Sequence, residues 1–195
     1  MPEHADNGGG WCRSRWRIAA WSAAALMLLP LFAMQFTDEV NWGAADFAIF
    51  GAMLASAGCI YEFAARTTGN RAYRAATGIA VVTAFMLIWM TLAVGVIGSE
   101  DNRANLMYGG VLAAGMIGAI LARFQSHGMA RAMVAMALTQ ALVAVIALIA
   151  GWGATGASWP GDIVFLTGFF TTLWLLSAWL FRKSSTGQTS AGGVP

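Results

Sequence analysis

Residues 132–151 read AMVAMALTQALVAVIALIAG, and this stretch decides the fold class. Thr139 and Gln140 are its only polar side chains. A helix on the surface of a soluble protein carries a polar face along its length, and these residues cannot supply one. Crossing a hydrocarbon core of about 30 Å takes roughly 20 mostly apolar residues. The stretch therefore predicts a transmembrane helix.

Five further runs of similar length and composition occur at residues 18–36, 46–65, 75–98, 106–122 and 163–181. The chain of 195 residues is 58% hydrophobic and 10% charged, whereas soluble domains carry about 25% charged residues. We therefore predict an all-α integral membrane bundle of six transmembrane helices, forming one domain over residues 18–183. Short loops make consecutive helices antiparallel neighbours. The first run ends without a small-x-small cleavage site, which favours a retained span over a signal peptide.

The basic residues alternate with these runs. Ten of the eleven Lys and Arg residues fall on one side of a six-span arrangement, namely Arg13, Arg15, Arg17, Arg66, Arg71, Arg74, Arg123, Arg131, Arg182 and Lys183. Cytoplasmic loops collect such residues, so the alternation predicts that both termini are cytoplasmic. Arg103 alone falls on the other side. The polar segments 1–17 and 184–195 are then predicted to be disordered cytoplasmic tails.

Composition also excludes several classes of function. A net charge of +2 is too small to indicate nucleic-acid binding, which leaves the lipid bilayer as the predicted partner. His4 and His127 are the only histidines and cannot build a multi-histidine metal site. The sequence contains no HExxH, GxSxG, CxxC or P-loop motif, so we predict no catalytic residue and no cofactor. Cys12 and Cys59 are predicted to be free thiols.

The outer loops are acidic and form the first candidate site. Its residues are Asp38, Glu39, Asp46, Glu100, Asp101 and Asn105. Oxygen ligands of this kind suit Ca²⁺ or Mg²⁺, and they could also concentrate a cation at a pore mouth. The alternative is that they are solvated loop residues and helix caps, because no EF-hand spacing is present.

Glu62 and Gln140 form the second candidate site, inside the predicted spans. An ionisable group within a membrane indicates function by default, but Arg66 lies one turn from Glu62 and offers an i,i+4 ion pair. Gln140 is expected to hydrogen-bond to a neighbouring helix. The hydroxyls of the intramembrane threonines are expected to bond back to their own helices.

Small residues recur every four positions in the fourth run, at Gly110, Ala114 and Gly118. Such spacing lets two helix backbones approach closely. It predicts either a tightly packed central helix or a seam for a helix-mediated oligomer.

Residues 100–110, EDNRANLMYGG, are followed by ARF at 122–124 and GMAR at 128–131. This combination resembles a group of small bacterial multi-pass inner-membrane proteins with no assigned activity. The resemblance covers roughly residues 35–183. It implies a location in a bacterial cytoplasmic membrane and supplies no functional residues.

Three functional hypotheses remain open at this point. The first is a non-enzymatic accessory or structural membrane protein. The second is a small transporter or channel with an electronegative outer mouth. The third is a membrane enzyme that uses the outer-face carboxylates, and the lack of catalytic motifs leans against it.

Overall fold

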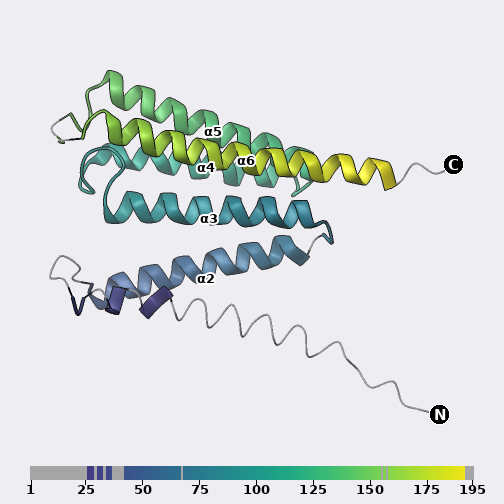
Figure 1. The fold of residues 1–195 in the computed structure, drawn as a ribbon, viewed down its shortest axis with the longest axis horizontal. Coiled ribbons are helices and arrows are strands. Elements are labelled where there is room, and N and C mark those ends of the chain that lie inside the picture. Colours follow the sequence, from purple (N-terminus) through teal and green to yellow (C-terminus); the bar gives the residue numbers. More distant parts are fainter. Residues whose placement is uncertain are drawn as a thin grey trace, which may run out of the picture. The chain divides into compact units, whose positions relative to one another are not determined.

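The computed structural model describes residues 26–28, 30–32, 34–36, 42–66, 68–154, 156 and 158–191 (Figure 1). The segment 1–17 and most of the first predicted span, residues 18–36, lie outside the described residues. The described elements are α2 (Ala44–Arg66), α3 (Arg71–Ala93), the 3₁₀ helix η1 (Arg103–Met107), α4 (Tyr108–Leu121), α5 (Ser126–Ile149) and α6 (Gly161–Ala191). Two compact units make up the chain, Met1–Cys59 and Ile60–Pro195.

The described helices have the length and composition of membrane spans. Five of them, with η1 and α4 taken together as residues Arg103–Leu121, are long and apolar enough to cross a membrane. Large apolar side chains point outward along α5, where Leu138, Leu142 and Ile149 are all more than half exposed. Such a surface suits lipid rather than water. The all-α class predicted from the sequence is confirmed for the described part of the chain, in which no strand occurs.

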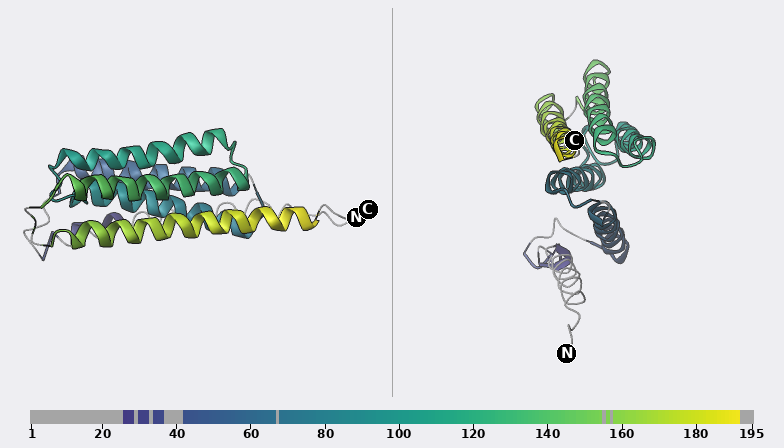
Figure 2. Two further views of the ribbon diagram at one scale, coloured as in Figure 1. Left: turned by 90° about the horizontal axis from the view of Figure 1, so that it is seen from above. Right: turned by 90° about the vertical axis from the view of Figure 1, so that its right-hand side faces the viewer.

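Within the unit Ile60–Pro195, helices α3 to α6 surround one core (Figures 1 and 2). Helix α6 packs against both α3 and α5, and α4 packs against α5. The hydroxyl of Ser177 on α6 donates to the carbonyl of Ala76 on α3 at 2.9 Å. Gly118 on α4 lies so close to α5 that an added Cβ would come within 2.6 Å of the Ala132 methyl group. The helices are therefore held by close backbone approach as well as by apolar burial.

Helix α3 ends at Ala93, five residues before the end of the predicted third span. Gly95 has a φ of +78°, which a continuing α-helix does not permit, and its amide bonds to the Met90 carbonyl at 2.9 Å. This is the usual way in which a glycine terminates a helix. The chain then folds inward, because Val96 and Ile97 are buried.

Helix α6 continues to Ala191, past the predicted end of the sixth span at Phe181. The side-chain amide of Asn70 donates to the Ser184 carbonyl at 3.2 Å. The hydroxyls of Ser184, Ser185 and Thr186 bond to carbonyls three residues back. The helix therefore extends into the polar residues beyond Phe181, and the Asn70 bond joins it to the start of α3.

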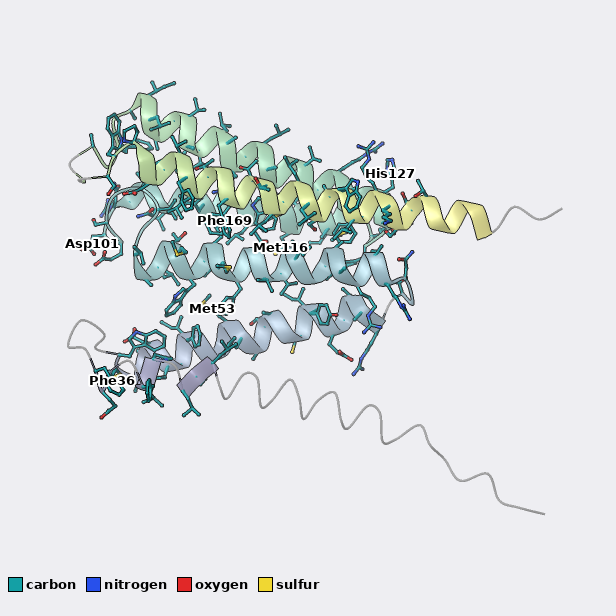
Figure 3. All side chains as sticks on the ribbon, in the orientation of Figure 1. Phe36, Met53, Asp101, Met116, His127 and Phe169 are labelled. Atoms are coloured by element: carbon teal, nitrogen blue, oxygen red, sulfur yellow. The ribbon has the colours of Figure 1, made fainter. Side chains whose placement is uncertain are left out.

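The charged residues lie at the two ends of the α3–α6 bundle (Figure 3). We call the end with Glu100, Asp101 and Asp162 the acidic end, where Arg103 also lies. The opposite end, which we call the basic end, carries Arg71, Arg74, Arg123, Arg131, Arg182 and Lys183. Figure 3 labels Asp101 at the acidic end and His127 at the basic end. The helix surfaces between the two ends are apolar.

Two loops meet at the acidic end through glycines. Gly98 lies in the loop after α3 and Gly153 in the loop after α5, and their φ angles are +75° and +80°. A Cβ added to Gly153 would lie 2.9 Å from the Gly98 amide nitrogen. The two backbones are therefore in direct contact, and a side chain at Gly153 would collide with the Gly98 backbone.

This contact predicts different costs for alanine at two nearby glycines. Gly151 and Gly153 both have positive φ, so alanine at either should cost about 1–2 kcal/mol. An added Cβ meets nothing within 4 Å at Gly151, whereas at Gly153 it meets the Gly98 backbone. We expect Gly153→Ala to lower the thermal unfolding midpoint in detergent further than Gly151→Ala. Equal midpoints for the two variants would show that the loop contact adds no stability.

Candidate functional site

The acidic residues of the first candidate site fall in different parts of the structure. Glu100 and Asp101 are exposed in the loop between α3 and η1. Asp46 belongs to the unit Met1–Cys59, and Asp38 and Glu39 lie outside the described residues. Among the residues that the structure describes, no group of three or more His, Cys, Asp or Glu side chains could hold a metal ion.

Asp46 acts as a helix cap in the first turn of α2. Its Oδ2 accepts a hydrogen bond from the Gly43 amide at 2.8 Å. A carboxylate in this position satisfies an amide that the helix leaves unpaired, and it interacts favourably with the helix dipole. The capping role that the sequence offered as the alternative is the one that Asp46 performs.

Asn105 organises the loop at the acidic end. Its Oδ1 accepts hydrogen bonds from the amides of Val96 at 3.0 Å and Ile97 at 2.9 Å, and its Nδ2 donates to the Ser99 carbonyl at 2.7 Å. The residue is only 3% exposed. Asn105 therefore holds residues 96–99 against η1 through these hydrogen bonds. Its amide is directed into its own loop rather than toward an external ligand.

Glu62 forms the ion pair that its spacing predicted. Its Oε1 lies 3.0 Å from Nε of Arg66, one turn along α2. Both side chains are at least partly exposed. A solvent-accessible i,i+4 pair contributes about 0.3–0.5 kcal/mol. Glu62 is therefore a paired charge near the end of α2.

Gln140 is completely buried, at 0% exposure. The expectation that it would hydrogen-bond to a neighbouring helix is wrong, because neither atom of its amide finds a partner among the described residues. Buried polar atoms without partners also occur on the side chains of Tyr108, Thr167, Thr171 and Trp174. We call these five residues the polar seam. Each unsatisfied group destabilises the fold by about 1–3 kcal/mol.

The polar seam runs along one side of α6 and reaches α4 and α5. Thr167, Thr171 and Trp174 are spaced by four and three residues, which places them on one face of the helix. The Tyr108 hydroxyl, on the first residue of α4, faces Thr167 without completing a hydrogen bond. Gln140 lies about as far from the end of α5 as Thr171 lies from the start of α6. These two antiparallel helices pack together, so the two residues lie at similar depths.

Sequence patterns identified part of this seam. Gln140 and the threonines were identified as polar residues within apolar runs, whereas Trp174, which is completely buried, was not identified as a site residue. Tyr108 was missed as a site residue. Its position at the start of an apolar run, after an acidic loop, gave no indication that its hydroxyl would be buried.

The small residues of α4 differ in whether they pack against the rest of the chain. Gly118 packs against Ala132 of α5, and a Cβ on Gly115 would meet the Met136 sulfur at 2.4 Å. Close packing within the chain is therefore confirmed for this part of α4. Gly110 is exposed, with nothing within 4 Å of an added Cβ. Ala114 lies between these positions and is partly buried.

Comparisons of the chain with protein-family models, with curated proteins and with solved structures find no match. The class of the protein therefore follows from the fold itself. Helices of membrane-spanning length, with charges confined to their ends, are the architecture of a multi-pass membrane protein.

The hydrogen bonds of Asn105 predict a larger structural role than that of Asn102. Asn105→Ala would leave the buried Val96 and Ile97 amides unpaired, at about 1–3 kcal/mol each. Asn102→Ala would remove one bond to the Ala104 amide, a cap worth about 1 kcal/mol. We expect the thermal unfolding midpoint in detergent to fall clearly further for Asn105→Ala. A smaller fall than for Asn102→Ala would contradict the structural role of Asn105.

Proposed function

We propose that this chain is a non-enzymatic, six-span protein of a bacterial cytoplasmic membrane that serves as an accessory or structural subunit. The proposal rests on how the charged residues are distributed along α3–α6. The acidic residues lie at one end and all basic residues except Arg103 at the other, and no charged side chain is buried among the described residues. Because Lys and Arg resist translocation, this arrangement supports a cytoplasmic basic end.

The apolar surface of the bundle supports a role based on helix contacts. Large side chains such as Leu138 on α5 and Phe165 on α6 point outward. Lipid tails or the helices of another membrane protein would both cover such a surface. Gly109 and Gly110 leave space on α4 for a close helix approach, which supports association at this end of the small-residue stripe, whereas Gly118 is already packed against Ala132.

A small transporter or channel is the second candidate. Glu100 and Asp101 favour this candidate, because both are exposed in the loop before η1 and α4. The polar seam begins at Tyr108, the first residue of α4. Acidic residues at such a mouth would raise the local concentration of cations. The interior of the bundle argues against an ion pathway, since the buried polar groups of the described residues are all uncharged.

The proposed orientation predicts the accessibility of cysteines at the two ends of the bundle. Ser99 and His127 are both exposed and lie at the acidic and basic ends. In a background with Cys12→Ser and Cys59→Ser, Ser99→Cys should react with an impermeant maleimide in intact cells. His127→Cys should react only after the membrane is permeabilised. Labelling of both cysteines from the same side would contradict the spanning bundle, and the opposite pattern would reverse the orientation.

Ion flux separates the two functional candidates. The purified full chain in liposomes should move K⁺, Na⁺ and Ca²⁺ no faster than protein-free liposomes, because an ion in the bundle would lack a buried counter-charge. Dye-based flux under an imposed membrane potential measures this. Flux that falls in the Glu100→Gln, Asp101→Asn double variant would overturn the accessory role and establish the channel.

A further inference from the structure

The polar seam brings six unpaired polar atoms into one part of the bundle. They are the hydroxyl oxygens of Tyr108, Thr167 and Thr171, the amide nitrogen and oxygen of Gln140, and the indole nitrogen of Trp174. Tyr108, Gln140 and Trp174 are at most 1% exposed. Folded proteins pair nearly all their buried polar groups with protein atoms or with ordered water. A concentration of unpaired groups on three adjoining helices therefore calls for partners that the described residues do not provide.

Neighbouring threonines on the same helices behave differently. Thr172 donates to the Gly168 carbonyl at 2.7 Å, and Thr139 donates to the Ala135 carbonyl at 2.9 Å. Thr167 and Thr171 have the same option of bonding to the carbonyl four residues back, and they do not use it. Their hydroxyls therefore do not bond to their own helix, unlike those of Thr139 and Thr172. The lack of partners is a property of the seam rather than of threonine in these helices.

The unpaired groups form a line rather than scattered points. From Thr167 to Trp174 the axis of α6 rises by about 10 Å, with Thr171 between them on the same face. Tyr108 faces Thr167 at the end of this line nearest the acidic loop. Gln140 lies on α5 at about the depth of Thr171. The line thus leads from the start of α4 toward the middle of the bundle.

The chemistry of these groups defines what could bind to them. The Trp174 indole only donates, the hydroxyls donate and accept, and the Gln140 amide does both from separate atoms. A charged ligand would be unpaired in a medium of low dielectric, because the described residues bury no charged side chain. The complementary molecule is uncharged and small, and it carries donors and acceptors together. Water satisfies this description when it has two to four polar partners, and so does a short polyol.

We propose that the polar seam is a binding site for small uncharged hydroxylic molecules, either water or a short polyol. The bound molecules donate to Gln140 Oε1 and the seam hydroxyls, and they accept from Gln140 Nε2 and Trp174 Nε1. This inference goes beyond the accessory role and does not depend on it, because a structural subunit and a transporter can both hold such molecules. Ion flux tests the function, whereas the experiment below tests the seam.

The indole proton of Trp174 provides a direct measurement. The full chain is prepared in detergent micelles with ¹⁵N-labelled tryptophan, and the Trp174 resonance is assigned by its loss in Trp174→Phe. Magnetisation transfer from water to this proton then reports hydroxylic molecules in the seam. We expect transfer in the wild-type protein and a several-fold reduction in Gln140→Met and Thr171→Val. Thr172→Val is the matched control, because Thr172 is adjacent but bonded to its own helix, and it should behave like the wild type.

Titration with glycerol distinguishes the two proposed ligands, water and a short polyol. A saturable shift of the Trp174 resonance in the wild type, absent from Gln140→Met, assigns the seam to polyols. Transfer from water without a glycerol shift assigns it to water. The proposal is overturned if the wild type shows neither effect, or if Thr172→Val reduces the transfer as strongly as Thr171→Val. Because Val has nearly the shape of Thr, Thr171→Val keeps the test decisive should Gln140→Met fail to fold.

Discussion

Hydrocarbon offers no hydrogen-bond partners, and the architecture of this protein depends on that constraint. A backbone that crosses a membrane must satisfy its own amides and carbonyls, which a continuous α-helix does. The same constraint acts on side chains within the helices. Thr83 and Thr91 each bond to the carbonyl four residues back, so they need no partner from another helix. Charged side chains cannot be satisfied in this way, and they lie at the ends of the bundle.

The constraint explains why so much of the fold could be predicted from the sequence. Apolar length, the alternation of basic loops and the i,i+4 spacing of Glu62 and Arg66 are local properties, and local rules identify them. The ends of the helices were harder to predict from the apolar runs, because capping and tertiary contacts set them. Helix α3 stops where Gly95 takes a left-handed conformation. The last turns of α6 are joined to Asn70, a residue 114 positions away in the chain.

The candidate site could be predicted only in part, for a related reason. Asn105 in an acidic loop has the same sequence pattern whether it binds a ligand or binds its own loop, and only the bonds to Val96, Ile97 and Ser99 distinguish the two. The sequence identified Gln140 as a polar residue within a predicted span. The groups that its side chain faces, however, depend on how each helix is rotated about its own axis. Helix rotation also explains why Gly118 packs on Ala132 of the same chain while Gly110 remains open.

The two polar features near the acidic end differ in what they cost the fold. Glu100 and Asp101 are exposed and remain hydrated, so their presence requires no compensation and no special function. The polar seam holds six buried polar atoms without partners among the described residues, and an unpaired buried group costs about 1–3 kcal/mol. The seam therefore needs partners and the exposed loop does not, which makes the uncharged interior a stronger indication of binding than the charges of the loop.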